Sequence, residues 1–250
     1  STHHVCRRQR QMCIRDSAAP VYFNSLGEGS SIDQQFSSNA KSGDVNMSYG
    51  VRASYAVNKK LSIRSGINRV SLGYTTNDVI AFQSLASQSS SLSQLPNVKS
   101  NFSVNEVNTT SLVSADNLSS KRSNGLLSSS SNTSINQEFG YIEIPLEIQY
   151  NLLDKKFGIN VIGGFSSLFL NENKLYTESN GSRSLLGEAG NINNVSYSAN
   201  FGLGLNYKVS ERFDLNLEPI FKYQINTFEN TSGDFNPYFI GVYTGLAIKF

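Results

Sequence analysis

The side chains that most often carry catalysis are concentrated at the start of this 250-residue chain. Both histidines, His3 and His4, and both cysteines, Cys6 and Cys13, lie within residues 1–17. Two histidines without a third ligand make a weak metal site, and two cysteines in one short segment give no disulfide framework. We therefore expect no metal, no cofactor and no catalytic group that depends on His or Cys.

Glu143 and Glu147 are the strongest candidates for an acid–base pair, because they lie two strand steps apart on one face. The same side of the predicted strands carries four acids and four bases, which would neutralise one another in a dry interior. We expect a structural charge network, with an enzymatic carboxylate pair as the alternative. The network comprises Arg52, Arg64, Glu143, Glu147, Lys208, Asp214, Glu218 and Lys222.

Apolar and polar residues alternate along several segments, which indicates β-strands with one apolar face. The clearest strand ends the chain, with its apolar face formed by Tyr238, Ile240, Val242, Leu246, Ile248 and Phe250. Bacterial outer-membrane barrels typically end in a barrel-closing strand with a terminal Phe, and the chain resembles them here. The alternation predicts strands at 45–57, 61–74, 142–152, 157–170, 195–209, 213–223 and 238–250, with a truncated first strand at 19–24.

The predicted connections alternate in length. Tight polar turns lie at 58–60, 154–156 and 210–212, whereas long links lie at 25–44, 75–138, 171–194 and 225–237. Short periplasmic turns and long extracellular loops are the pattern of an outer-membrane barrel. The sequence therefore predicts an eight-stranded antiparallel up-and-down transmembrane barrel, with a Ser/Asn-rich extracellular loop at about 75–138.

Two local irregularities lead to further expectations. The apolar phase of the second predicted strand changes between Ile67 and Val70, and a β-bulge near Asn68-Arg69 would restore it. Pro145 and Pro219 lie in mid-strand, where each removes a hydrogen-bond donor. We expect bulges or local irregularity at both prolines.

Alternation alone does not decide whether the apolar side faces lipid or a ligand-filled interior. A soluble lipocalin-like binder of apolar ligands is the alternative. The number of large apolar residues exceeds what a small interior holds, and aromatic residues flank the short turns as an interfacial girdle would. The girdle comprises Tyr55, Tyr150, Phe157, Tyr207 and Phe213. We predict that the apolar side contacts outer-membrane lipid.

Residues 1–17 differ from the rest of the chain. Gln11–Ser17 is what the transposase mosaic-end adapter of sequencing libraries would encode, and a natural disordered tail is the alternative. We set this segment apart from the barrel at 18–250. The net charge of +2, with no basic stripe interleaved with aromatics, argues against a nucleic-acid partner.

Four stretches carry a family resemblance: APVYFNSLGEGSSID, KSGDVNMSYGVRASYAVNKKLSIRSGINRVSLGY, YIEIPLEIQYNL and LEPIFKY. They resemble the PorT-like and related porin-fold outer-membrane β-barrel proteins of Bacteroidota over residues 18–82 and 138–250. The resemblance implies an amino-terminally truncated fragment and transfers no catalytic residue.

Together these features favour a non-enzymatic outer-membrane barrel with a structural or surface-interaction role through its loops. An accessory role in a secretion or transport machine is an alternative that the sequence does not separate from the first. The barrel-assembly machinery is an expected partner through the carboxy-terminal strand, and the surface or secretion partner is unknown.

Overall fold

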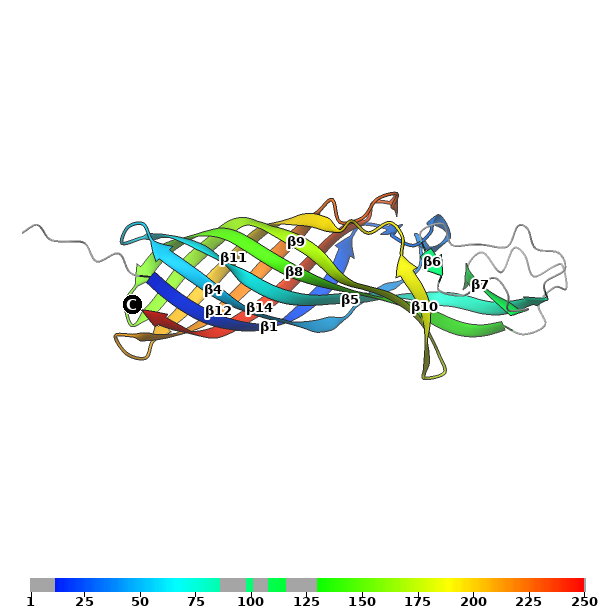
Figure 1. Cartoon of the computed structure of the whole chain (residues 1–250), viewed down its shortest axis with the longest axis horizontal. Coiled ribbons are helices and arrows are strands. Elements are labelled where there is room, and N and C mark those ends of the chain that lie inside the picture. The colour runs from blue at the N-terminus through cyan, green and yellow to red at the C-terminus, as the bar shows by residue number, and fades with distance from the viewer. Residues whose placement is uncertain (1–11, 86–97, 101–107, 116–129, 250) are drawn as a thin grey trace, which may run out of the picture.

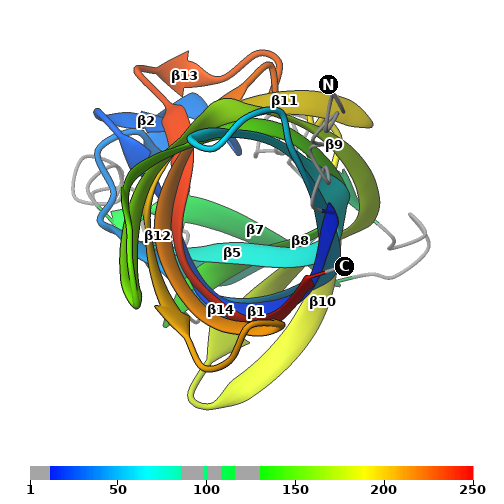
Figure 2. The ribbon, with the colours of Figure 1, turned by 90° about the vertical axis from the view of Figure 1, so that its left-hand side faces the viewer.

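The computed structural model describes residues 12–85, 98–100, 108–115 and 130–249, and in it eight antiparallel strands form a closed ring (Figures 1 and 2). The ring closes where the first strand pairs with the last. This confirms the predicted eight-stranded barrel. Its strands, in spatial order, are β1 (Met12–Leu26), β4 (Val45–Ala56), β5 (Leu61–Leu85), β8 (Ser130–Asp154), β9 (Phe157–Ser179), β11 (Val195–Lys208), β12 (Phe213–Ile225) and β14 (Asn236–Lys249).

Several strands continue far beyond the barrel at its long-loop end (Figure 1). A tilted strand crosses a membrane in about 9–11 residues, whereas β5 and β8 have 25 residues each and β9 has 23. The expected long loops are therefore partly sheet. The smaller elements at this end are β2 (Gly29–Ser30), η1 (Gln34–Phe36), β3 (Lys41–Gly43), β6 (Val98–Ser100), β7 (Asn108–Ser114), β10 (Ser182–Ala189) and β13 (Ser232–Gly233).

The predicted loop boundaries are consequently wrong at two places. The 75–138 link is strand up to Leu85 and again from Ser130, and the 171–194 link is mostly the β9–β10 hairpin. Asn180 and Gly181 form the hairpin turn with φ values of 51° and 76°, the left-handed pair that a tight two-residue hairpin requires. The polar composition of these segments led to the prediction of loops. In the structure, backbone pairing with neighbouring strands makes them strands instead.

The first strand begins earlier than the sequence predicts. β1 has 15 described residues and starts at Met12, so residues 12–17 belong to the barrel. Met12–Tyr22 pairs with β4 in continuous register. The rest of the segment that the sequence sets apart lies outside the described residues.

The junction between β1 and β14 is bridged partly by a side chain. The carboxylate of Asp16 accepts a hydrogen bond from the Leu246 amide, with 2.9 Å between Oδ1 and N. The backbones approach so closely that a Cβ on Gly245 would lie 1.9 Å from the Asp16 carbonyl oxygen. Asp16 is exposed on the same side of β1 as Ile14, so its carboxylate lies on the apolar exterior.

The short turns are stabilised by side chains that accept backbone hydrogen bonds. Asn58 Oδ1 accepts from the amides of Lys60 and Leu61, at 2.8 and 2.9 Å. Ser210 Oγ accepts from the amides of Arg212 and Phe213. Asn and Ser favour tight turns by this mechanism.

The β-bulge predicted near Asn68-Arg69 is wrong. The pairing of β4 with β5 keeps one register from Ala56↔Ser62 to Ser48↔Val70. The apolar phase changes because Val70, Leu72 and Tyr74 point into the barrel and are buried there. The interior of the barrel is apolar at the long-loop end. Inward-facing residues therefore become apolar there without any change of register, which explains the sequence pattern.

The two mid-strand prolines are accompanied by local irregularity, as expected, but not by bulges. Between β5 and β8 the register is the same before and after the two residue pairs that are missing near Pro145. The same is true between β11 and β12 near Pro219. The ladder thus tolerates each lost donor by leaving a short gap, and the other neighbouring strand still pairs with each proline.

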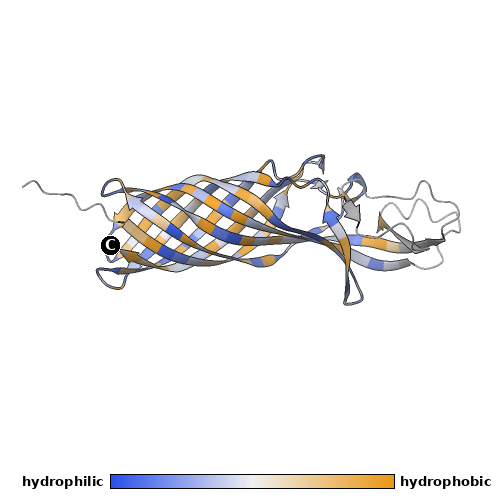
Figure 3. Cartoon of the chain, in the orientation of Figure 1, coloured by the Kyte–Doolittle hydropathy of each residue, from blue (hydrophilic) through white to orange (hydrophobic). Residues whose placement is uncertain are grey.

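Hydrophobic and hydrophilic residues alternate along the barrel strands (Figure 3), and the hydrophobic ones are exposed on the outer surface. Ile144, Leu203 and Val242 are 43%, 47% and 39% exposed, whereas Glu147 and Glu218 are 1% exposed. The lipocalin-like alternative is therefore wrong, because its apolar side chains would line the interior. The predicted girdle residues Tyr150, Phe157 and Phe213 are also exposed beside the short turns.

An exterior of this kind belongs in hydrocarbon. Closed β-strand structures can cross a membrane because every strand finds a partner. Together with the short turns at one end, this identifies an integral outer-membrane β-barrel. No helix in the described ranges is long and apolar enough to cross a membrane.

Candidate functional site

The interior of the barrel is organised in layers along its axis. From the short-turn end upward, the inward residues of β5 are Ser62, Arg64, Asn68, Val70, Leu72 and Tyr74, which change from polar to charged to apolar. The inward residues of β8 follow the same order from Gln149 to Phe139. The lumen therefore contains a polar chamber, a charged layer and an aromatic layer.

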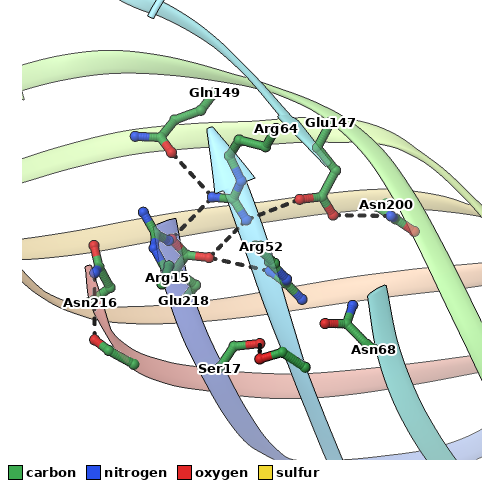
Figure 4. A network of polar contacts seen from close by, with 12 residues as sticks. Arg15, Ser17, Arg52, Arg64, Asn68, Glu147, Gln149, Asn200, Asn216 and Glu218 are labelled. Atoms are coloured by element: carbon green, nitrogen blue, oxygen red, sulfur yellow. Dashed lines mark hydrogen bonds and ion pairs between the residues drawn. The ribbon is translucent and has the colours of Figure 1, made fainter. Parts of the chain in front are cut away.

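The charged layer is centred on Glu218 of β12. Its carboxylate accepts two hydrogen bonds from the Arg64 guanidinium, at 3.1 and 3.0 Å, and another from Arg15. Arg52 Nη1 lies 3.6 Å from Glu218 Oε2. Arg64 also contacts Glu147 at 3.0 Å (Figure 4). Three cations from β1, β4 and β5 thus converge on one carboxylate.

A second ion pair lies above this cluster. Lys222 Nζ donates to Glu143, whose carboxylate also accepts from Ser166 Oγ at 2.6 Å and Asn68 Nδ2 at 3.1 Å. Both charged side chains are fully buried. A buried pair needs such additional hydrogen bonds, because Coulomb attraction alone barely repays the loss of hydration.

The predicted network residues fall into two groups. Arg52, Arg64, Glu143, Glu147, Glu218 and Lys222 form the charged layer across the lumen. Lys208 and Asp214 lie lower, around the chamber at the short-turn end. Lys208 is 36% exposed and pairs with Asp154 at 2.5 Å, at the mouth of the barrel. Asp214 is buried.

Sequence reasoning missed Arg15, which it assigned to the excluded amino-terminal segment. Arg15 is buried and bonded to Glu218. It lies on the inward side of β1 with Ser17, Ala19, Val21 and Phe23. Burial alternates from Phe23 back to Cys13 in the structure. The sequence does not show this alternation, because Asp16 lies on the outer side and Val21 and Phe23 lie on the inner side.

The two candidate carboxylates for acid–base chemistry are held in ion pairs. Glu143 and Glu147 bind Lys222 and Arg64 respectively, and neither side chain is exposed to solvent. Glu147 also accepts from Asn200 Nδ2 at 3.1 Å. Residues 12–85, 98–100, 108–115 and 130–249 contain no group of three His, Cys, Asp or Glu side chains placed to hold a metal ion.

The aromatic layer covers the charged layer on the loop side. Phe139 lies 5.7 Å from Phe23, 6.1 Å from Tyr74 and 5.6 Å from Phe228, measured between ring centroids. Phe235 joins the cluster through Tyr74 and Phe228. These rings fill the upper lumen with apolar side chains.

Cation–π contacts join the charged and aromatic layers. The Arg52 guanidinium lies 4.3 Å from the centroid of the Tyr243 ring, and Lys222 Nζ lies 5.0 Å from the same centroid. Such contacts are strongest where water is excluded. The layers therefore form one continuous plug across the lumen.

Segments between the strands cap the plug. Ile32 and Phe36 are buried against Val79, Ile135 and Leu175 of the extended sheet. Asn191 Nδ2 donates to the carbonyls of Ser31 and Glu229, at 2.8 Å each, and so links three loops. Lys41 Nζ donates to the carbonyls of Phe36, Ser37 and Asn39. The extracellular end is thus closed by a packed and hydrogen-bonded cap.

Comparisons with known proteins find similarity only among solved structures, and only at a distance. No protein-family model and no curated protein sequence matches the chain. Among solved structures, OprG from Pseudomonas aeruginosa has a TM-score of 0.47 at 13% identity, covering 96% of each chain.

Two other solved structures are similarly distant. Neisserial surface protein A has a TM-score of 0.45 at 12% identity, covering 96% of this chain and 97% of its own. The outer-membrane protein AlkL, determined in lipid bilayers, has a TM-score of 0.44 at 11% identity, covering 97% of this chain and 90% of its own. Because all three TM-scores lie below 0.5, the account of the barrel rests on its own strand pairing and burial pattern.

Proposed function

We propose that the protein is a closed, non-enzymatic outer-membrane barrel that acts through the extracellular sheet and loops that it presents. The observation that carries this proposal is the blocked lumen beneath a large folded extracellular part. About eight strands leave an interior just wide enough for side chains to fill it. Here the charged and aromatic layers fill it, so the part of the protein available to partners outside the cell is the cap and the extended sheet.

We also propose that the protein has no catalytic role, because of the chemistry of the described residues. Glu143, Glu147 and Glu218 are paired with cations, and the chain's histidines, His3 and His4, lie outside the described residues. General acid–base and nucleophilic catalysis depend on a group whose proton or lone pair is available. None of the ion-paired carboxylates described above meets that requirement.

Planar-bilayer conductance of the purified protein tests the closed lumen. We expect no stable channel currents from the wild-type protein. A double variant that removes side chains from both layers, Arg64→Ala with Phe139→Ala, is the sensitising control. Large, stable conductance from the wild-type protein would contradict the proposal.

Photo-crosslinking on intact cells tests the interaction role. A photoreactive residue at Leu185, exposed on the β9–β10 hairpin, should give a discrete crosslinked species outside the membrane. The same group at Leu203, on the lipid-facing wall, is the matched control. Identical products at both positions would contradict a specific extracellular partner.

The resemblance to PorT-like proteins of Bacteroidota supports a second proposal, an accessory role in secretion or transport. We also propose that β14 binds the barrel-assembly machinery, because its pairing with β1 closes the barrel. A partner that crosslinks to the periplasmic turns and not to the hairpin would favour the accessory role.

A further inference from the structure

A chamber of about 560 Å³ opens at the short-turn end of the barrel, opposite the extracellular cap. All eight barrel strands contribute to its wall. Its inner end is formed by Arg15, Gln149 and Asn216, beside the ion pairs of the charged layer. Small side chains at Ser54, Ser62 and elsewhere leave the space open. The chamber therefore communicates with the periplasm and ends blindly inside the lumen.

Amides and hydroxyls dominate the chamber wall. An amide side chain both donates and accepts hydrogen bonds, as a hydroxyl group does. The neutral polar side chains that line the chamber are Ser54, Asn58, Ser62, Gln149, Asn151, Asn206, Ser210 and Asn216.

The charges of the chamber are largely paired within the protein. Lys208 binds Asp154 at the mouth and Arg15 binds Glu218 at the inner end. Lys59 and Glu211 add one charge of each sign at the rim, and Asp214 adds a further carboxylate to the wall. The lining thus holds three cations and three anions. An ionic ligand would therefore meet a wall with little uncompensated charge, and charge attraction would contribute little to its binding.

The wall also disfavours an apolar ligand. The apolar lining is limited to Ala56, Leu153 and Ala247, and no aromatic residue of the described chain lines the chamber. The volume lies within the range of about 300–1,000 Å³ that is usual for sites of small molecules. Size and chemistry together fit a neutral ligand with many hydroxyl groups.

We propose that this periplasmic chamber binds a neutral, hydroxyl-rich carbohydrate of about disaccharide size. Planar amide side chains from β8, β11 and β12, Asn206 among them, hydrogen-bond its hydroxyls. The free sugar of the periplasm and the end of a cell-wall glycan share this chemistry. The site goes beyond the proposed function, because it faces the opposite side of the membrane from the extracellular sheet.

Cys13 provides a built-in reporter, because it lines the chamber. In a Cys6→Ser background, the rate of Cys13 modification by a small, charged thiol reagent is measured in detergent micelles with increasing trehalose. We expect a saturable decrease in rate of about tenfold, with half-protection in the millimolar range. Chitobiose in place of trehalose distinguishes a glycan end from a free sugar: stronger protection by chitobiose assigns the glycan, and stronger protection by trehalose assigns the free sugar.

Two variants control the experiment. Lys155→Cys, combined with Cys6→Ser and Cys13→Ser, places the thiol on the turn between β8 and β9, outside the chamber wall, and its rate of modification should not change. Asn206→Ala should raise the half-protecting concentration about fivefold, as expected for one lost hydrogen bond. Unsaturable slowing at both cysteines, or no protection of Cys13 by either sugar, would overturn the proposal.

Discussion

Arg64 on β5 and Glu218 on β12 form an ion pair across the full width of the barrel, with 3.0 Å between Nη2 and Oε2. Three strands separate β5 from β12 in either direction around the ring. The pair therefore connects opposite walls, and Arg15 and Arg52 bring two more strands to the same carboxylate. Ion pairs between side chains from several walls therefore cross the lumen.

Removal of Glu218 should be costly for this reason. Glu218→Ala leaves Arg15, Arg52 and Arg64 with one fewer anion in a buried site, and breaking a buried pair in this way costs about 3–5 kcal/mol. Urea unfolding in lipid vesicles measures the change. Glu172→Ala, which removes an exposed partner of Lys174, should cost about 0–1 kcal/mol. Equal losses for the two variants would contradict the role of Glu218.

Much of the fold follows from the sequence because period-2 alternation directly reports a strand with two different surroundings. Val195–Lys208 alternates in sequence throughout its length, and burial alternates in the structure from Val195 to Leu205. Alternation fails where both surroundings are apolar. Val70, Leu72 and Tyr74 look like a shifted outer face, but they fill the upper lumen.

The sequence also predicts which charged residues face the interior, because they alternate with apolar residues along the strands. It does not predict which of them pair with one another. An ionisable residue on the inward side of a narrow barrel requires a counter-charge, so balanced acids and bases were predictable. Which strands meet across the lumen depends on barrel closure and tilt, which no local pattern reports. Arg15 was missed because residues 1–17 were set apart from the barrel, on the resemblance of Gln11–Ser17 to an adapter-encoded sequence.

The aromatic layer should contribute more stability than lipid-facing rings. Phe139 is 2% exposed and contacts three other rings, so Phe139→Ala should cost about 3–5 kcal/mol. Phe165 is 66% exposed on the outer wall, where lipid chains can occupy the space that a smaller residue leaves. Phe165→Ala should therefore cost less, by the same unfolding measurement. A larger loss at Phe165 would show that the upper lumen is not tightly packed.

Asp16 offers a test of the barrel seam. Its carboxylate accepts the Leu246 amide hydrogen but places a charge on the apolar exterior. Asp16→Asn keeps an acceptor and removes the charge, so we expect equal or greater stability. Asp16→Ala also removes the acceptor and should be about 1 kcal/mol less stable than Asp16→Asn. If the two variants unfold identically, this hydrogen bond does not stabilise the seam.

Asp44 should make stability depend on pH. It precedes β4 on the loop side, and burial raises the pKa of its carboxyl above the usual value, despite a hydrogen bond from Asn136. The folded state therefore binds the proton more tightly than the unfolded state does. The loss of folding stability that this causes is complete at pH values above the pKa of Asp44 in the folded state. It decreases as the pH falls through that pKa toward the lower pKa of the unfolded state.

The matched variant isolates this effect. The difference in unfolding free energy between Asp44→Asn and the wild type should favour the variant at neutral pH and shrink as the medium is acidified. Parallel unfolding series across that range measure it. A difference that grows on acidification would show that the pKa is lowered instead.

The most direct test of the outward apolar face is collision accessibility of spin labels in lipid vesicles. Labels at Leu203 and Val242 should collide often with oxygen, which concentrates in hydrocarbon, and rarely with a water-soluble nickel chelate. A label at Asn216 in the chamber should show the opposite preference. High nickel accessibility at Leu203 and Val242, with oxygen favoured at Asn216, would contradict the transmembrane barrel.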